Sequence, residues 1–394
     1  MTQREVFFVG GARTAIGSFG GSLKDVPPTQ LGATVIKAAV ERAGIAADAV
    51  GHVVMGTVIP SEPKDAYLSR VAAVNAGIPK ETPAFNVNRL CGSGLQAIVS
   101  AAQTILLGDA DIAVGGGAEN MSRGAYLLPG ARWGTRMGDA QIVDFMVGAL
   151  HDPFKNVHMG ITAENVAERY GISREMQDEL AVVSHQRAAR AIAEGRFKDQ
   201  IVPVVQETRK GPVTFDTDEN VRKDTTVEAL SKMRAVFKKD GLVTAGNASS
   251  INDGAAAVVL AGGDRVKALG LKPQARLVAY AHAGVDPDIM GIGPVPATRA
   301  VLQRAGLTVD QLDVIESNEA FAAQACAVAK ELGFDPAKVN PNGSGISLGH
   351  PVGATGAILM VKAIAELHRI RGRYALCTMC IGGGQGIAMI IERV

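Results

Sequence analysis

Cys91 is the residue of this 394-residue chain whose setting most favours nucleophilic chemistry. It lies in Asn86-Val-Asn-Arg-Leu-Cys-Gly-Ser-Gly-Leu, between a short extended segment and the start of an apolar helix. Free backbone N–H groups and the helix dipole stabilise an anion at such a position, so the pattern predicts an acidic, nucleophilic thiol. The glycines on either side of Ser93 would let an acyl group approach the backbone. A buried structural cysteine is the alternative.

His350 is the candidate base for this thiol. It lies in Asn342-Gly-Ser-Gly-Ile-Ser-Leu-Gly-His-Pro, at a position of the second half of the chain that matches Cys91 in the first. Related positions of a duplicated fold tend to face each other, so a Cys–His pair is the hypothesis. A histidine that only satisfies a helix start is the alternative.

Two further candidates follow predicted strands of the second half. Cys377-Thr-Met-Cys380 spells C-x-x-C, but residues three apart on a strand point to opposite faces, which argues against a redox or zinc clamp. Cys380 is instead placed at the end of its strand, before Gly382, where it can face a site. Asn318 follows the strand that starts at Val314, at the edge where α/β active sites form; a turn or N-cap role is equally open. Cys326 is assigned to a helix and to the core.

An internal repeat indicates how these residues are positioned. Arg42-Ala-Gly-Ile-Ala-Ala-Asp matches Arg304-Ala-Gly-Leu-Thr-Val-Asp, and Cys91-Gly-Ser-Gly matches His350-Pro-Val-Gly at nearly the same separation. Both halves alternate short apolar strands with amphipathic helices, such as the one predicted from Leu95 to its stop at Gly108. The pattern predicts two α/β halves packed side by side.

The middle of the chain differs from both halves. Residues 151–240 contain 30 charged residues in 90, which indicates a solvated insertion on the first half. Six basic residues gather there, and they form either a solvated face or a cradle for phosphates. They are Arg222, Lys223, Lys232, Arg234, Lys238 and Lys239.

The composition and two weak motifs argue against several classes of function. The formal net charge of +1 gives no reason to expect nucleic acid or a membrane as partner, and apolar runs such as 255–261 are too short to span a bilayer. With four cysteines and no secretory signal, we expect a cytoplasmic protein with reduced thiols. Gly345-Ile-Ser-Leu-Gly resembles a serine hydrolase elbow, but His350 is only three residues from Ser347, and only His368 follows to complete a triad in the expected order, which disfavours a serine hydrolase. Gly10-Gly-Ala-Arg-Thr-Ala-Ile-Gly lacks the Gly-Lys-Ser/Thr of a phosphate loop, which disfavours a nucleoside triphosphatase.

Across the whole chain the sequence resembles the thiolases, and more narrowly the bacterial biosynthetic-type β-ketothiolases or acetyl-CoA acetyltransferases. The motifs that carry the resemblance are Asn88-Arg-Leu-Cys-Gly-Ser-Gly-Leu-Gln-Ala, His158-Met-Gly-Ile-Thr-Ala-Glu-Asn, Thr244-Ala-Gly-Asn-Ala-Ser, Asn318-Glu-Ala-Phe, Gly349-His-Pro and Cys380-Ile-Gly-Gly-Gly.

The resemblance implies a duplicated, five-layered α/β/α/β/α sandwich with an inserted loop domain that binds coenzyme A. We divide the chain accordingly into an N-terminal half (1–120 plus 251–271), a loop domain (121–250) and a C-terminal half (272–394). The resemblance also implies a homotetramer built from tight dimers. Acetyl-CoA, short acyl-CoA and coenzyme A are the expected substrates, with no metal and no separate cofactor.

The resemblance also assigns roles to the candidate residues. Cys91 becomes acylated, His350 activates it, and Cys380 moves a proton between carbon and the coenzyme thiol. Asn318, with a water and His350, forms one oxyanion hole, and the N–H groups of Cys91 and Gly382 form the other. The residues implied for coenzyme A are Arg222 at the adenine and phosphates, His158, Met159, Phe237, Ala245, Ser249 and Met290 along the pantetheine, and Phe321 near the acyl end.

One position departs from the family pattern, because Ser250 stands where many members have glycine; the channel near the thioester is expected to differ slightly. The expected reaction is a reversible Claisen condensation of acetyl-CoA with a second acetyl-CoA or a short acyl-CoA. A degradative 3-ketoacyl-CoA thiolase of β-oxidation is the first alternative. A decarboxylating ketoacyl synthase, which needs no second thiol, and a noncatalytic acyl-CoA-binding protein are the others.

Overall fold

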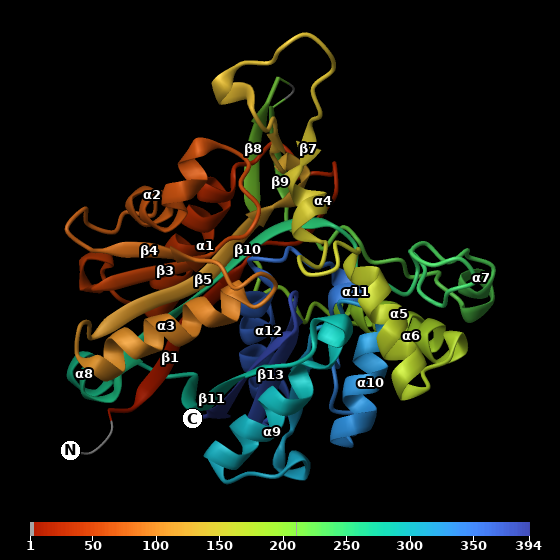
Figure 1. The fold of residues 1–394 in the computed structure, drawn as a ribbon. Coiled ribbons are helices and arrows are strands. Elements are labelled where there is room, and N and C mark those ends of the chain that lie inside the picture. The colour runs from red at the N-terminus through yellow and green to blue at the C-terminus, as the bar shows by residue number, and fades with distance from the viewer. Residues whose placement is uncertain (1–3, 210) are drawn as a thin grey trace.

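A ten-stranded sheet forms the centre of the computed structural model, which describes residues 4–394 except residue 210 (Figure 1). The strands of its first half are β1 (Val6–Arg13), β2 (Gly17–Ser18), β3 (His52–Gly56), β4 (Ala84–Val87), β5 (Ile112–Asn120) and β10 (Asn252–Gly262). The strands of its second half are β11 (Ala275–Gly284), β12 (Val314–Ser317), β13 (Tyr374–Ile381) and β14 (Gln385–Arg393).

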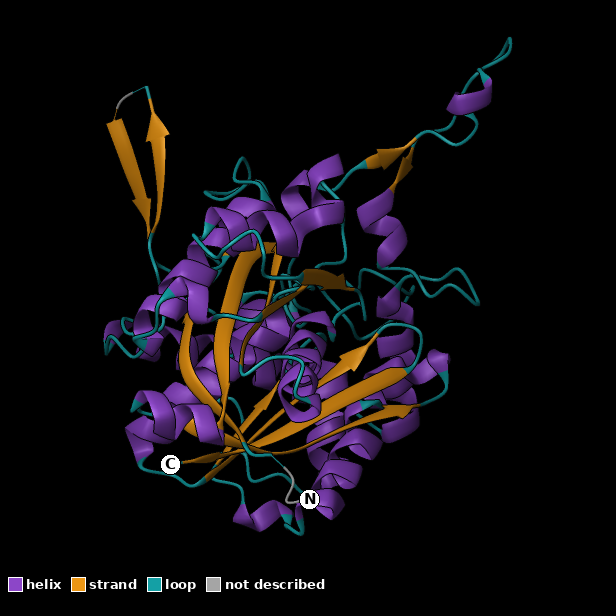
Figure 2. Cartoon of the chain, turned by 90° about the vertical axis from the view of Figure 1, so that its left-hand side faces the viewer, coloured by secondary structure: helices purple, strands orange, loops and turns teal. Residues whose placement is uncertain are grey.

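The two halves of the sheet have the same internal order. In the first, the order is β3-β5-β10-β1, and in the second it is β12-β13-β14-β11. The β3/β5 and β12/β13 pairs are parallel, and the remaining pairs of both series are antiparallel. The halves join where β1 meets β11 through Phe7 opposite Arg276 and Phe8 opposite Ala275. Figure 2 shows the strands fanning out as two groups, as the internal repeat predicts.

Helices cover both faces of each half. Those of the first half are α1 (Pro28–Ala43), α2 (Leu68–Asn75), α3 (Ser93–Leu107) and α8 (Gly263–Leu269), and those of the second are α9 (Pro294–Ala305), α10 (Ala322–Leu332), α11 (Gly345–Leu348) and α12 (Thr355–Ile370). On β5, Gly115 faces α3 whereas Ala118 faces α1, so these two helices lie on opposite faces. Helix α12 packs on strands of both halves, next to α3. The layers are therefore helix, sheet, helix, sheet and helix, and the α/β prediction is confirmed.

Helix α3 forms where the apolar periodicity predicts it. Leu95, Ile98 and Ala102 are fully buried, and Gly108 ends the helix in the left-handed region with a φ of 86°. The stretch Leu90–Leu107 is also long and apolar enough to cross a membrane, which the apolar-run argument did not anticipate. Because 61% of that stretch is buried inside the protein, it is accounted for as a core helix.

Close packing between α3 and α12 brings the equivalent ends of the two halves together. A methyl group on Gly94 would lie 2.9 Å from the backbone nitrogen of Ala357, and one on Gly356 would lie 2.3 Å from that of Leu95. Only glycine permits this approach of the two backbones. The crossing lies near the start of each helix, so the turns that hold Cys91 and His350 lie near the same junction.

Glycine has a similar packing role in β1. A methyl group on Gly10 would lie 2.5 Å from the carbonyl oxygen of Ala39 in α1. The Gly10-Gly11 pair therefore lies inside a strand and lets a helix pack closely on it. This position is incompatible with a phosphate-binding loop, as the missing Gly-Lys-Ser/Thr already indicated.

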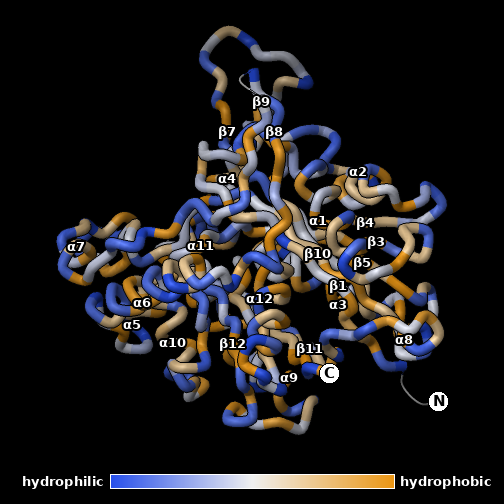
Figure 3. The backbone as a smooth tube through the Cα atoms, turned by 180° about the vertical axis from the view of Figure 1, so that it is seen from behind, coloured by the Kyte–Doolittle hydropathy of each residue, from blue (hydrophilic) through white to orange (hydrophobic). Residues whose placement is uncertain are grey.

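The segment between β5 and β10 leaves the sheet. It contains α4 (Phe145–Ala149), α5 (Met159–Tyr170), α6 (Arg174–Ala193), α7 (Val227–Ser231) and two hairpins, β6 (Tyr126–Leu127) with β7 (Val143–Asp144) and β8 (Val204–Thr208) with β9 (Gly211–Phe215). Both hairpins project from the body (Figure 2), whereas the central strands and helices carry most of the hydrophobic stretches (Figure 3).

A buried ion pair attaches this segment to the first half. Arg13 of β1 donates two hydrogen bonds to Asp218, at 2.8 and 2.9 Å, and both side chains are fully buried. The guanidinium also lies 4.7 Å from the centre of the Phe197 ring. Removing one member would leave the other charge buried and unpaired, so the contact holds the insertion in a defined position.

Candidate active site

Cys91 lies in a tight turn between β4 and α3. Ser93 fixes this turn, because its hydroxyl accepts a hydrogen bond from the N–H of Arg89 at 2.9 Å and donates one to the carbonyl of Leu90 at 2.6 Å. Leu90 has a φ of 46°, an unusual conformation for a branched side chain directly before the candidate nucleophile. The thiol is thus presented at the start of α3, as the sequence predicts.

The glycines beside Ser93 have a different role from the one expected. A methyl group on Gly92 would lie 2.5 Å from Cδ1 of Ile381, and one on Gly94 would meet the backbone of Gly353, Ala354 and Ala357. The space next to them is therefore filled by the second half of the chain. They allow the two halves to approach, and an acyl group would not lie against them.

Burial, not the helix start, dominates the ionisation of Cys91. Desolvation is the main reason that the pKa of the thiol is raised to about 11, and the charge of the nearby Glu119 carboxylate contributes in the same direction. The backbone N–H groups of Gly382 and of Cys91 itself act in the opposite direction, by hydrogen bonding that lowers this pKa. The expectation of an unusually acidic thiol is therefore wrong for this state. The two N–H groups do lie at the sulfur, where an oxyanion hole was predicted.

His350 is buried in a turn held by the first half of the chain. Its N–H donates to Oδ1 of Asn252 at 2.9 Å, and three residues later the N–H of Gly353 donates to Glu119 at 2.8 Å. Burial lowers the pKa of His350 to about 4, so the ring is neutral near pH 7. The turn that carries the candidate base is thus fixed by two side chains from the other half.

Thr355 determines which ring nitrogen of His350 carries no proton. Its hydroxyl donates its single proton to the carbonyl of Pro351 at 2.9 Å, so it accepts a hydrogen bond from Nδ1 of His350, at 2.6 Å. Nε2 is then the unprotonated nitrogen, and it lies 3.4 Å from Nδ2 of Asn318. The imidazole has the tautomer that a general base requires.

Asn318 directly follows β12 at the edge where it was expected. Its amide nitrogen faces His350, and its Oδ1 is buried without a hydrogen-bond partner among the described residues. A buried amide oxygen without a partner is costly unless a bound group satisfies it. The amide can therefore accept a hydrogen bond from a molecule in the site.

Cys380 and Cys377 lie on opposite faces of β13. Cys377 belongs to the hydrophobic core of the first half and its junction, whereas Cys380 belongs to a separate cluster with Met159, Met290 and Phe321. The argument against a two-thiol clamp is confirmed by this arrangement. Burial raises the pKa of Cys380 strongly, and the adjacent Cys91 raises it further, which places the two thiols near each other.

The Cys91 and His350 turns lie near each other, with no direct hydrogen bond between the two side chains in the described chain. Val352, two residues after His350, packs in the same small cluster as Cys91, together with Val58. Catalytic hydrogen bonds are often long or misaligned in unliganded structures and tighten around a substrate. The structure brings Cys91, Cys380 and Gly382 together on one side and His350 with Asn318 on the other.

Most residues predicted for the pantetheine channel form one aromatic and apolar cluster. His158 stacks on Phe237 at 4.5 Å with an interplanar angle of 14°, and Phe237 meets Phe321 edge-on at 6.2 Å. His158 also starts α5, where its Nδ1 accepts from the N–H of Gly160. Met159 and Met290 pack in the same cluster as Cys380. A flexible, mainly apolar ligand arm would fit such walls.

The remaining predicted coenzyme residues lie outside this cluster or at its border. Ser249 is half-buried and its N–H donates to Ala320 at 2.9 Å, whereas Ala245 is exposed. Arg222 is exposed, with its backbone N–H bound to His185 and no ion pair found for its guanidinium among the described residues. Lys232 and Lys238, in contrast, pair with Glu228 and Glu168. Arg222 thus keeps its charge available, but no contact joins it to the thiols.

Three residues of the site were missed from the sequence: Glu119, Asn252 and Thr355. Glu119 is fully buried and accepts hydrogen bonds from the N–H groups of Val58, Ile59 and Gly353. Burial raises its pKa to about 8. A carboxylate at the end of the otherwise apolar strand β5 was the available signal. Asn252 and Thr355 gave no such signal in the sequence, because the partner of Asn252 is distant along the chain and that of Thr355 lies about one helical turn away.

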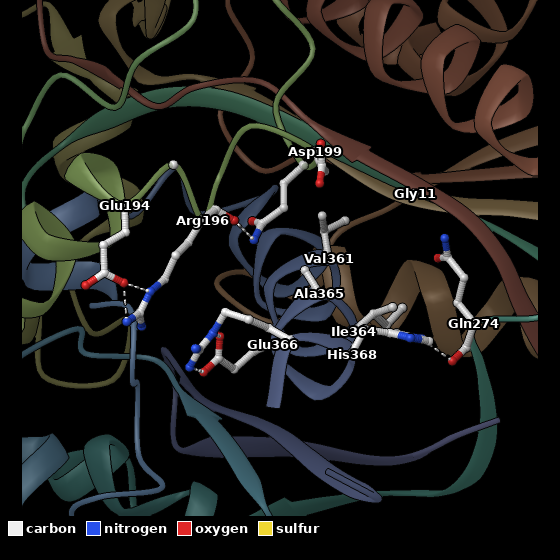
Figure 4. Close-up of a pocket in the computed structure, with 13 residues that line it drawn as sticks. Gly11, Glu194, Arg196, Asp199, Gln274, Val361, Ile364, Ala365, Glu366 and His368 are labelled. Atoms are coloured by element: carbon white, nitrogen blue, oxygen red, sulfur yellow. Dashed lines mark hydrogen bonds and ion pairs between the residues drawn. The ribbon is translucent and has the colours of Figure 1, made fainter. Parts of the chain in front are cut away.

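Two other features are distinct from this site. Ser347 is buried, and its hydroxyl pairs with Ser184 at 2.8 Å, so it is no exposed elbow nucleophile. A cavity of about 500 Å³ lies over α12 (Figure 4), and its charged walls are largely paired internally, Glu194 with Arg196 and Glu366 with Arg369. None of the predicted site residues lines it.

Family models and relatives match the whole chain. The thiolase N-terminal domain matches residues 6–264 and the thiolase C-terminal domain matches residues 271–393. The β-ketothiolase BktB of Cupriavidus necator is 68% identical over 392 residues, covering 99% of this chain and 100% of that protein. An acetyl-CoA acetyltransferase of Pseudomonas aeruginosa is 52% identical over 393 residues, with 99% and 100% covered.

Solved structures agree with the fold. The acetyl-CoA acetyltransferase of Bacillus anthracis superposes with a TM-score of 0.97 at 45% identity, covering 100% of this chain and 99% of that one. Human mitochondrial 3-ketoacyl-CoA thiolase in complex with CoA superposes with a TM-score of 0.96 at 44% identity, with 99% and 98% covered. The layered α/β architecture described above is thus shared over its full length with enzymes of known structure.

Proposed function

The chain belongs to the thiolase family, and from that premise we propose that it is a β-ketothiolase of the acetyl-CoA C-acetyltransferase type. The reaction is the reversible Claisen condensation of acetyl-CoA with acetyl-CoA or a short acyl-CoA to a 3-ketoacyl-CoA and free coenzyme A. Two observations carry this proposal: the neighbouring thiols of Cys91 and Cys380, and a neutral imidazole, with its Nε2 unprotonated, on the His350 turn that packs near Cys91 through Val352.

The first half-reaction acylates Cys91. Its sulfur attacks the thioester carbonyl of an acyl-CoA while Nε2 of His350 takes the thiol proton. The N–H groups of Cys91 and Gly382 stabilise the oxyanion of the tetrahedral intermediate. When the C–S bond to coenzyme A breaks, Cys380 protonates the leaving thiolate. Splitting the transfer through acyl-Cys91 replaces one difficult step by two easier ones.

The second half-reaction forms the carbon–carbon bond. Cys380, now a thiolate, removes the α-proton of acetyl-CoA, and the enolate oxygen is stabilised by His350 and by a water held on Asn318. The enolate carbon then attacks acyl-Cys91, and the Cys91 sulfur leaves and regains its proton from His350. Enolate stabilisation is what makes a thiolate an adequate base for a weakly acidic C–H bond.

The buried environment explains why the resting residues are neutral. Burial holds the pKa of Cys91 at about 11 and that of His350 at about 4, so a separated thiolate–imidazolium pair is disfavoured before substrate binds. Proton transfer to Nε2 therefore accompanies the attack of sulfur on the carbonyl. The N–H groups at Cys91 and Gly382 stabilise negative charge where it then develops.

Coenzyme A would bind with its pantetheine arm along the His158, Phe237 and Phe321 rings, close to Met159. Arg222 would bind phosphate or the adenine from the exposed loop, since its charge has no ion-pair partner in the described chain. Ala245, Ser249 and Met290 are assigned to the same channel. The thioester is the reactant itself, so the proposed reaction involves no metal and no separate cofactor.

A homotetramer built from dimers is the proposed assembly. The projecting hairpin β6–β7 exposes large apolar side chains, including Trp133 at 88% and Met137 at 103%. Apolar side chains held away from the body of a protein are typical of a surface that a partner covers. We also keep the division into residues 1–120 plus 251–271, 121–250 and 272–394, and the cytoplasmic location, as predictions.

Incubation with acetyl-CoA tests the function. We expect the intact mass to rise by one acetyl group and peptide mapping to place it on Cys91. Condensation of two acetyl-CoA molecules to acetoacetyl-CoA should follow, without decarboxylation of a malonyl group. An acetyl group on Cys377 or Ser347, or tight binding without acetylation, would overturn the assignment. A degradative role would show as thiolysis that favours long over short 3-ketoacyl-CoAs.

A further inference from the structure

Glu319 is a buried acid directly after Asn318, and no step of the proposed reaction uses it. The residue is 3% exposed. No lysine or arginine of the described chain forms an ion pair with it, since the nearby Lys362 is paired with Glu316 at 2.6 Å. A buried carboxylate without a cation is costly unless hydrogen bonds satisfy it. The partners of this side chain therefore indicate what it does.

Three hydrogen-bond donors surround the Glu319 carboxylate. Its Oε2 accepts from the hydroxyl of Ser184 at 2.6 Å and from the N–H of Ile346 at 3.4 Å, and its Oε1 accepts from Nδ2 of Asn340 at 2.9 Å. The Asn340 amide cannot be reversed, because its Oδ1 accepts from the N–H of Ser317. Two of the three partners can therefore only donate, which favours the charged carboxylate although burial raises its pKa.

These donors connect the Asn318 segment to parts of the chain that are remote in the sequence. They come from α6 of the inserted segment, from α11 and from the loop between α10 and α11. Helix α11 packs on α6 (Figure 1). It also lies against Asn318 itself, because a methyl group on Gly345 would lie 2.8 Å from Oδ1 of Asn318 and 2.6 Å from the carbonyl oxygen of Glu319. A shift of α11 therefore displaces the amide.

His350, the other member of the same oxyanion site, is held independently. Its backbone N–H is bound to Asn252, and its Nδ1 is bound to Thr355. Neither hydrogen bond involves Glu319 or a donor to Glu319. Loss of the Glu319 contacts should therefore displace Asn318 while the proposed base stays in place.

We propose that Glu319 is a positioning residue that holds the Asn318 amide in place for the enolate half-reaction. In the proposed reaction Asn318 holds the water at the enolate oxygen, whereas acylation uses the N–H groups of Cys91 and Gly382. Glu319 therefore governs proton removal from carbon and not the acylation of Cys91. This inference rests on the proposed function, because it needs Asn318 to serve enolate formation.

Glu319→Gln tests this role at nearly constant size. The substitution turns one acceptor into a donor, which would face either Nδ2 of Asn340 or the N–H of Ile346, and neither of these can accept. Only the Ser184 hydroxyl can reverse its direction. At least one of the three hydrogen bonds is therefore lost while the space stays filled.

The experiment compares two rates at saturating acetyl-CoA. Acetylation of Cys91 is followed by rapid quench and mass spectrometry, and proton removal from carbon by exchange of the acetyl α-hydrogens in deuterated water. For Glu319→Gln we expect exchange to fall about 10- to 100-fold and acetylation to stay within about threefold of wild type, because a small misplacement of one group affects only the step that uses it. Ser184→Ala removes one donor and should give a smaller loss, again of exchange alone.

A double variant shows whether Glu319 acts through Asn318. Asn318→Ala should itself lower exchange more than acetylation. Adding Glu319→Gln to Asn318→Ala should then cause little further loss of exchange, because the amide that Glu319 positions is already absent. A residue that only supports the fold would lower the rate again.

Glu164→Gln is the matched control. Glu164 is also a buried glutamate, and its carboxylate accepts hydrogen bonds from the N–H groups of Leu242 and Val243 at 2.8 to 2.9 Å. No hydrogen bond joins it to Asn318 or to α11 among the described residues. Its ratio of exchange to acetylation should equal that of wild type.

The outcomes separate this inference from the proposed function. Absence of acetyl-Cys91 and of exchange in wild type would refute the function itself. With both reactions present in wild type, an equal loss of both rates in Glu319→Gln, an unchanged exchange rate, or a fully additive loss in the double variant would overturn the positioning role alone. If Glu319→Gln fails to fold, Ser184→Ala, alone and combined with Asn318→Ala, decides the question by the same criteria.

Discussion

Nδ1 of His350 lies 2.6 Å from Oγ1 of Thr355, and this contact determines which nitrogen of the ring accepts a proton. The Thr355 hydroxyl donates its only proton to the carbonyl of Pro351, so it acts as an acceptor toward the imidazole. The backbone of His350 is held separately by Asn252. A side chain five residues along the chain thus selects the tautomer of the proposed base, while the other half of the molecule holds its backbone.

Thr355→Val should slow acylation of Cys91 while leaving the fold intact. Without the acceptor hydroxyl, Nδ1–H is unsatisfied and the ring populates the other tautomer, which presents a proton to the thiol. We expect the acylation rate, followed by rapid quench and mass spectrometry, to fall about 10- to 100-fold, an effect of the size typical for general base catalysis.

Thr355→Ser should restore most of that rate, since it returns the hydroxyl. Thr82→Val is the matched control, because Thr82 is also a buried threonine bonded to a backbone carbonyl, that of Val50 at 2.9 Å. A loss in the Thr82 variant equal to that in Thr355→Val would show a general packing defect and not a tautomer effect.

Cys380→Ser should separate the two thiols by role. An alcohol is a much weaker acid than a thiol, so proton transfer to and from carbon should fail while Cys91 stays nucleophilic. We expect acetyl-Cys91 to form at a reduced rate, with little condensation and no exchange of the acetyl α-hydrogens in deuterated water.

Cys91→Ser should instead lose the covalent intermediate. Cys377→Ser serves as the control for a buried cysteine on the same strand, and we expect it to keep both reactions. Near-normal condensation and exchange in Cys380→Ser would favour the synthase-like alternative, which has no second thiol base.

The pH dependence of acylation should follow the lowered pKa of His350. A base must be unprotonated, and burial lowers the pKa of this ring to about 4 from its ordinary 6.5. The kcat/KM for acylation by acetyl-CoA should therefore stay high as pH falls through 6.5 and be lost only as pH approaches about 4. Stopped-flow measurements from pH 4.5 to 8 would check this, and an acid limb centred near 6.5 would contradict it.

Arg222→Ala should weaken coenzyme binding more than it slows turnover at saturation. Because Arg222 is exposed, we expect about a fivefold rise in KM, equivalent to ~1 kcal/mol, with kcat nearly unchanged. Added salt should reduce the difference. Lys232→Ala is the control, since Lys232 pairs with Glu228 at 2.6 Å. Equal KM values for Arg222→Ala and wild type would contradict phosphate binding and show that the basic cluster is only a solvated surface.

The candidate site could largely be placed from the sequence because its residues stand at the ends of elements. Asn318 follows β12 and Cys380 is the penultimate residue of β13, and both positions come from the period and the limits of apolar runs. The opposite faces of Cys377 and Cys380 follow from strand geometry alone. The internal repeat alone makes Cys91 and His350 equivalent positions of the two halves.

The tertiary structure decided those properties of the site that depend on residues remote in the sequence. The sequence shows a thiol at a helix start and predicts an acidic one, but burial by the second half raises the pKa of Cys91 to about 11. Glu119 accepts a hydrogen bond from Gly353 of the His350 turn, 234 positions away in the sequence, and Gly94 allows two helices to cross closely. Local pattern therefore determined which residues come to the site, whereas desolvation and contacts between the halves determined their ionisation and orientation, because both depend on atoms that are remote along the chain.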